Sequence, residues 1–201
     1  MSMVQLLKAV RSNLIADESL RTAIKGSSET PLTALDCEIR LEGRPTKHAG
    51  KTFLGIHGLS WNAGPATEHN ILEEYFGLAV TISRRIGSIP EDRWGTTLYL
   101  DAAESLENLS RLVILSISKN RYTILTAANT AITDANETIF DSHTFYRPMT
   151  FVNADPEPRV EIGDWYGLAM EETAALVMQV RFDGAERIQP LTSEAEQLAL
   201  S

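Results

Sequence analysis

Residues 75–87, YFGLAVTISRRIG, place large apolar side chains and small or polar side chains at alternate positions. The large residues are Phe76, Leu78, Val80 and Ile82, and the small ones are Gly77, Ala79, Thr81 and Ser83. Successive side chains of a β-strand point to opposite faces of the sheet, so one face of this segment is strongly apolar and the other is not. The pattern predicts a strand in a sheet that is covered on one side.

Helical patterns precede and follow this strand. Residues 4–24 carry apolar side chains at helical spacing, and Asp17 is expected to cap a second short helix that stops at Gly26. A long helical region begins near Asp101, and the polar residues 118–120 are expected to break it into two helices. These patterns predict amphipathic helices that pack on a sheet.

Further strand-like segments complete the chain. Residues 37–43 and 51–61 are separated by a turn-rich segment and are expected to form a hairpin, whereas residues 133–147 look irregular. Three more strands are expected at 147–154, 158–165 and 174–184. Because the strands follow one another through short connections, we expect an α+β fold with a mostly antiparallel sheet, helices packed on one face, and long loops.

Length and composition limit the class of protein. A chain of 201 residues, 43% hydrophobic, is expected to form a single domain over residues 1–190, followed by a mobile arm at 191–201. No apolar run approaches the roughly 20 residues of a membrane-spanning helix, so we expect a soluble intracellular protein. The formal charge of −9 argues against general binding to nucleic-acid phosphates. Cys37 is the only cysteine, which excludes an internal disulfide, and we expect a buried structural thiol.

Residues 55–74, GIHGLSWNAGPATEHNILEE, contain the densest group of reactive side chains. Ser60 fails the nucleophile-elbow pattern G-x-S-x-G, because the fifth position is asparagine. His57, His69 and Glu73 could bind one metal ion, but the HExxH spacing is absent. We therefore expect no catalytic residue and no cofactor, and we keep a metal-dependent hydrolase that uses these three residues as an alternative.

Residues 62–70 are instead expected to form a long polar hairpin loop through which the protein contacts a partner. The tryptophans lie at strand edges next to glycines, and two arginines close the strand at 75–87. Aromatic residues and arginine are enriched in protein interfaces. The candidate interface residues are Trp61, His69, Arg84, Arg85 and Trp94.

The order of elements along the chain carries a family resemblance. A helix, an Asp-x-x-Leu step and a glycine stop over residues 6–26 precede short strands and the strand at 77–87. A helix at 105–117 and a strand at 175–184 follow. This order resembles that of the tail terminator and related neck proteins of tailed bacteriophages.

The resemblance implies a structural virion protein of the tail or neck, made in the host cytoplasm. It implies a homo-oligomeric ring, a hexamer, that ends the tail tube and contacts the tube protein and a head-side adaptor or connector. DNA would pass through this ring without specific binding, and neither a membrane nor a catalytic residue is implied. The residues themselves leave a third alternative open, a monomeric adaptor that binds its partner by strand addition.

Overall fold

The structure is a computed structural model that describes residues 3–26, 29–33, 37–41, 52–65, 72–87, 97–133, 140–154, 159–162 and 174–190. The described helices are α1 (Met3–Ala16), α2 (Glu18–Lys25) and α3 (Thr97–Thr133). The described strands are β1 (Cys37–Leu41), β2 (Thr52–Pro65), β3 (Leu72–Gly87), β4 (Phe140–Ala154), β5 (Arg159–Ile162) and β6 (Ala174–Pro190).

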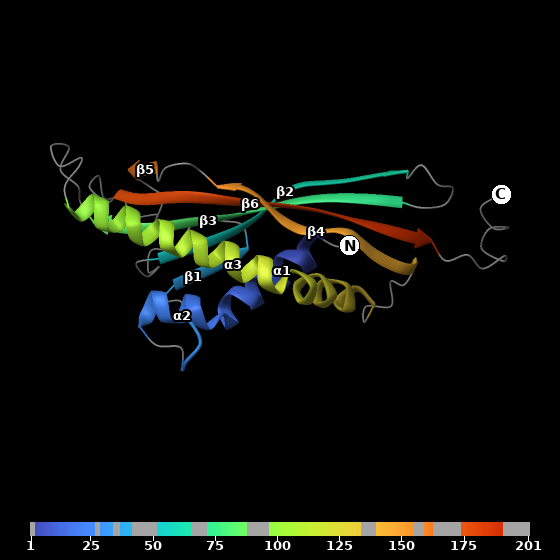
Figure 1. Cartoon of the computed structure of the whole chain (residues 1–201), viewed down its shortest axis with the longest axis horizontal. Coiled ribbons are helices and arrows are strands. Elements are labelled where there is room, and N and C mark those ends of the chain that lie inside the picture. Colours follow the sequence, from blue (N-terminus) through green and yellow to red (C-terminus); the bar gives the residue numbers. More distant parts are fainter. Residues whose placement is uncertain are drawn as a thin grey trace.

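The strands form one sheet in the order β1-β2-β3-β6-β4, and β5 also pairs with β6. β1 runs parallel to β2, and the other described pairings are antiparallel. Figure 1 shows the helices together on one side of this sheet. The expected α+β fold, with a mostly antiparallel sheet and helices packed on one face, is confirmed.

β3 lies at the centre of the sheet and supplies much of the core. It pairs with β2 on one side and with β6 on the other over almost its whole length. The alternation in its sequence is confirmed, because one set of alternate residues is buried together with residues of α1 and α3. The buried residues of β3 in this core are Phe76, Leu78, Val80 and Ile82.

The opposite face of β3 is also buried, contrary to the one-sided cover that the alternation predicts. Ala79, Thr81 and Ser83 are all buried. Their side chains are small, and longer neighbours on the flanking strands reach over them. Gln179 Nε2 donates a hydrogen bond to Thr81 Oγ1 at 3.3 Å, and Phe53, which pairs with Ser83, is fully buried. The face of small residues is therefore a second, thinner buried layer.

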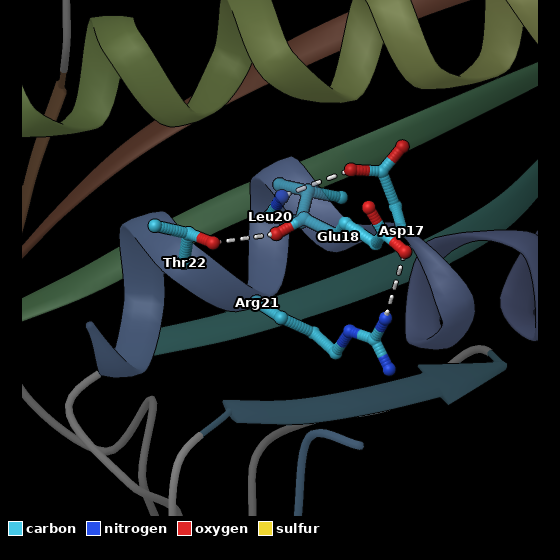
Figure 2. Close-up of polar contacts among 5 residues, drawn as sticks. All are labelled: Asp17, Glu18, Leu20, Arg21 and Thr22. Carbon is cyan, nitrogen blue, oxygen red and sulfur yellow. Dashed lines mark hydrogen bonds and ion pairs between the residues drawn. The ribbon is translucent and has the colours of Figure 1, made fainter. Parts of the chain in front are cut away.

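The N-terminal helix pair forms as the sequence predicts. Asp17 has an extended backbone, and its carboxylate accepts a hydrogen bond from the Leu20 N–H at 2.9 Å, so it caps α2. Figure 2 shows this cap next to the hydrogen bond that Thr22 Oγ1 donates to the Glu18 carbonyl oxygen. Gly26 ends α2 in the left-handed region, at φ 77°.

Side-chain hydrogen bonds tie α1 to both of its neighbours. Arg11 Nε donates to the Ile39 carbonyl oxygen of β1 at 2.8 Å, and Asn13 Nδ2 donates to Ser116 Oγ of α3 at 2.9 Å. Cys37 of β1 is buried in the same core, so its expected burial is confirmed. The helix pair is thus fixed to one edge of the sheet and to the long helix.

α3 is a single helix of 37 residues, so the predicted break at residues 118–120 is wrong. Ile117 and Ile124 are both buried, and their spacing of seven residues corresponds to about two helical turns. The apolar stripe therefore keeps its phase across the polar segment, in which Lys119 is exposed. Serine, lysine and asparagine cost a helix little where they face solvent.

The predicted hairpin between β1 and β2 is also wrong. The two strands are parallel, since Cys37 pairs with Thr52 and Leu41 with Ile56. The intervening residues 42–51 exceed the roughly two to five residues that join a hairpin. They are enough to bring the chain back along the short strand β1, because an extended chain spans about 3.3 Å per residue.

β4 begins at Phe140, inside the segment that the sequence suggests is irregular. It pairs with β6, but its register shifts at four places along the pairing. Each shift moves the following side chains out of the simple alternation that marks a strand in a sequence. The polar and irregular appearance of residues 133–147 is therefore the mark of a bulged edge strand over the part that the structure describes.

β6 continues to Pro190, the last residue of the expected single domain. The expected C-terminal arm, residues 191–201, lies outside the described residues. Among the helices that the structure describes, none is both long and apolar enough to cross a membrane.

Gly184 on β6 is predicted to be intolerant of a larger side chain. It pairs with Phe76, and a methyl group at Gly184 would lie 2.3 Å from Phe76 Cζ. We expect Gly184→Ala to lower the free energy of unfolding by roughly 1–3 kcal/mol, because the buried ring has little room to move. Urea denaturation measures this loss. In a Phe76→Ala background the same substitution should cost much less, and equal costs in both backgrounds would contradict the contact.

Candidate functional site

β2 and β3 form a long hairpin that contains the segment of dense reactive side chains. Residues 62–65 belong to β2, because their backbones pair with β3 up to Pro65 opposite Leu72. The loop expected at 62–70 is therefore wrong over its first four residues, and residues 66–71 lie outside the described part of the chain. The hairpin itself, which the sequence places across this segment, is confirmed.

The cover that α1 gives to this hairpin ends near Gly58. A methyl group at Gly58 would lie 3.1 Å from Met3 Cγ, at the beginning of α1. Figure 1 shows β2 and β3 running past α1 along the long axis of the molecule. We call residues 59–65 and 72–77 the distal hairpin.

The distal hairpin exposes large apolar side chains on both faces of the sheet. Trp61 is 57% exposed and pairs with Phe76, so it lies on the face that the helices cover further along the strands. Tyr75 is also exposed and points to the opposite face, because it neighbours Phe76 in the strand. Leu59 is exposed as the extra residue of a bulge between Gly58 and Ser60. Such a segment is suited to burial against a partner.

Both outer sides of this part of the sheet are edges within the described chain. β1 covers β2 only as far as Ile56, and β4 ends the strand order on the other side. β4 exposes Phe151 and Val152, of which Val152 is 49% exposed. The Phe151 ring packs edge-on against Phe182, with centroids 6.0 Å apart and planes at 69°. Apolar side chains are therefore exposed at both edges of one sheet.

The five candidate interface residues have different environments in the structure. Trp61 is exposed on the distal hairpin, where a partner can reach it. Arg84 makes a contact within the chain, because its Nη1 donates a hydrogen bond to Ser105 Oγ of α3. Arg85 lies on β3 with its backbone opposite Ala175. His69 and Trp94 lie outside the described residues.

Ser60, His57 and Asp183 come nearest to a catalytic arrangement, on the face of the sheet that has no described helix. A methyl group at Gly77 would lie 2.8 Å from Ser60 Oγ and 3.1 Å from Asp183 Oδ1, so both oxygens lean over that glycine. The His57 side chain lies over a different glycine, because its Nε2 would be 2.9 Å from a methyl group at Gly55. The two glycines belong to rows of the sheet about 13 Å apart along the strands. A serine nucleophile needs its base within hydrogen-bond reach, so these residues do not form a triad.

The metal site considered from the sequence would need His57, His69 and Glu73 side by side. His57 pairs with Ala79 and Glu73 with Gly64, so six residues of β3, about 20 Å, separate the two along the sheet. Ligands lie only about 2.0–2.2 Å from a shared zinc ion, which this separation prevents. His69 lies outside the described residues, and among those described no three His, Cys, Asp or Glu side chains converge.

A cleft of about 320 Å³ lies between α2 and the first half of α3. Its carboxylates, Asp101 and Glu104, are exposed, and its Ser105 accepts the hydrogen bond from Arg84. Solvated carboxylates on one helix, without a converging base or nucleophile, do not form an acid/base pair. The cleft is lined by Ala23, Asp101, Glu104, Ser105, Asn108 and Leu109.

Comparison with models of known protein families gave no match, and comparison with curated proteins gave no match either. Of the exposed apolar residues on the distal hairpin and β4, four are absent from the sequence-based candidates, namely Leu59, Tyr75, Phe151 and Val152. The adjacent aromatic residues Tyr75 and Phe76, which a strand turns to opposite faces, are the signal that could have indicated apolar side chains on both faces.

Arg84 is predicted to stabilise the fold rather than an interface. We expect Arg84→Ala to lower the free energy of unfolding by about 1–2 kcal/mol, because a hydrogen bond from a charged group between β3 and α3 is lost. Arg111→Ala is the matched control, since this solvent-exposed side chain only faces Glu107 at 3.8 Å on the surface of α3. The control should cost less than about 0.5 kcal/mol in the same denaturation experiment. Equal effects of the two substitutions would contradict the structural role of Arg84.

Proposed function

We propose that the chain is a structural virion protein of a tailed bacteriophage, whose copies form a ring that ends the tail tube and joins it to the head connector. The observation that carries the proposal is that both edges of the distal part of the sheet expose apolar side chains. A ring is built from head-to-tail contacts, in which one surface of a subunit binds a different surface of the next. Two distinct apolar edges on one sheet meet that requirement.

Exposed sheet edges make a monomeric protein prone to aggregation. Unpaired strand backbones next to apolar side chains favour association with other chains. An assembly protein turns this liability into a specific contact, because the edges are covered once the ring closes. The proposal therefore accounts for the exposure of Leu59 and Trp61 at one edge and of Phe151 and Val152 at the other.

The charge and the family resemblance complete the proposal. A basic lumen would hold DNA through counterion release, whereas a subunit with a formal charge of −9 lets DNA pass. The element order resembles that of tail terminator and neck proteins, and from this resemblance come the ring of six copies, the tube protein and the head-side adaptor as partners.

One alternative has a specific observation in its favour. Within the described chain, β2 has no strand on its outer side from Gly58 to Pro65, so an extended peptide of a partner could pair there. The protein would then be a monomeric adaptor. A metal-dependent hydrolase is not favoured, because the register separates His57 from Glu73.

The oligomeric state separates the ring from the adaptor. Size-exclusion chromatography with light scattering should give a discrete oligomer, a hexamer of 22.2 kDa subunits, and negative-stain electron microscopy should reveal rings. A protein that remains monomeric at every concentration would contradict the ring. Binding of one peptide by such a monomer would support the adaptor.

A further inference from the structure

We propose that the sheet continues from one copy of the chain to the next, with the outer side of β2 beyond Ile56 against the outer side of β4 in the neighbouring copy. Leu59 and Trp61 of one copy then meet Phe151 and Val152 of the other. This inference rests on the proposed ring and specifies the interface that builds it.

The directions of the strands permit this continuation. Across the distal sheet the order is β2, β3, β6 and β4, and each neighbour is antiparallel to the last. With four alternating strands, β4 runs opposite to β2. When the β2 of a second copy is placed beside β4, the new pair is again antiparallel, and every subunit repeats the same arrangement. A head-to-tail ring therefore forms with no parallel pair at the contact.

The exposed apolar residues of the two edges also lie at the same level of the sheet. Gly58 pairs with Leu78, Leu78 with Phe182, and Phe182 with Phe151, so these residues form one row from edge to edge. Leu59 follows Gly58 at one end of the row, and Val152 follows Phe151 at the other. Two copies joined in line therefore bring Leu59 next to the exposed residues of β4.

The aromatic residues of both edges lie on the same face. Trp61 pairs with Phe76, and Phe151 pairs with Phe182, and both partners belong to the buried core beneath the helices. A continued sheet therefore places Trp61 and Phe151 on one side of the contact, where the two rings can pack.

The bulges at the two edges limit and shape the contact. The register shifts between Gly58 and Ser60 on β2, and between Phe151 and Asn153 on β4. Bulges interrupt pairing and bend the strand, so only a short stretch near the common row can pair directly. Bending at each edge is also what a sheet needs in order to curve into a closed ring.

A cysteine cross-link tests this inference directly. In a Cys37→Ala background, which removes the buried thiol, we introduce Ser60→Cys together with Thr150→Cys. These two exposed positions share one row of the sheet, because Ser60 pairs with Gly77, Gly77 with Asp183, and Asp183 with Thr150. Within one chain these positions are three strand spacings apart, about 14 Å, which exceeds the roughly 7 Å limit for a disulfide. Across the proposed contact their Cα atoms lie at the roughly 4.5–5.5 Å of strand partners, within disulfide range.

Mild oxidation of the assembled protein should give a ladder of covalent oligomers on non-reducing gels. Each single variant should stay mostly monomeric on the gel, because a head-to-tail contact joins two different residues. The control pair is Leu115→Cys with Tyr122→Cys, at positions of α3 that are 63% and 56% exposed and so as accessible as Trp61. This control should give no ladder.

Light scattering of the unmodified chain distinguishes failure of the proposed ring from failure of the proposed β2–β4 interface. If that chain is monomeric, both the ring and this interface are overturned. If it assembles but the Ser60–Thr150 pair does not cross-link, or the α3 pair cross-links equally well, the interface is overturned and the ring stands. If the two cysteine substitutions at the sheet edges prevent assembly and the two on α3 do not, the interface is supported.

A substitution without cysteine gives a second readout. Trp61→Asp should weaken self-association by about tenfold or more, because a buried aromatic residue at a contact is replaced by a charge. Leu115→Asp should leave self-association unchanged. Assembly that is insensitive to Trp61→Asp but lost in Leu115→Asp would overturn the interface.

Discussion

The pairing of β3 with β2 on one side and β6 on the other is the constraint on which the rest of the structure depends. This pairing runs over almost the whole length of the strand, and residues 76–83 are buried on both faces of the sheet. A strand enclosed in this way sets the register of its neighbours, since a slip of one residue would turn the large side chains of Phe76 and Leu78 to the face built for small ones. The helices then have one large apolar face on which to pack.

The same arrangement determines what remains exposed. α1 covers the sheet only as far as Gly58, and β1 covers β2 only as far as Ile56, so the strands continue beyond both. Among the described residues of this distal part, Ser60 and Asp183 lie near Gly77 without His57, and no three His, Cys, Asp or Glu side chains converge. What it presents is backbone edges with apolar side chains, and these are the features of a surface for assembly.

Sequence patterns predicted the elements that are determined locally. The alternation in residues 75–87 indicated the central strand, and Asp17 indicated the start of α2, because each depends on neighbouring residues alone. The break expected at 118–120 was wrong, since packing against the sheet keeps α3 continuous. Of the candidate site, only Trp61 could be named in advance among the exposed apolar residues, and Phe151 was missed. Exposure at these positions depends on where a helix or strand that is distant in the sequence ends. A local sequence pattern cannot predict that end point.

Hydrogen exchange of the backbone amides tests the central claim that the two edges of the distal sheet are the contact between copies. The amides of dilute and assembled protein are compared by mass spectrometry, with β3 and β6 as internal references that are paired in either state. We predict slower exchange in the assembled protein near residues 58–64 of β2 and 150–153 of β4, with little change in β3 and β6. Unchanged exchange at both edges, together with slower exchange on the outer surface of α3, would contradict the claim.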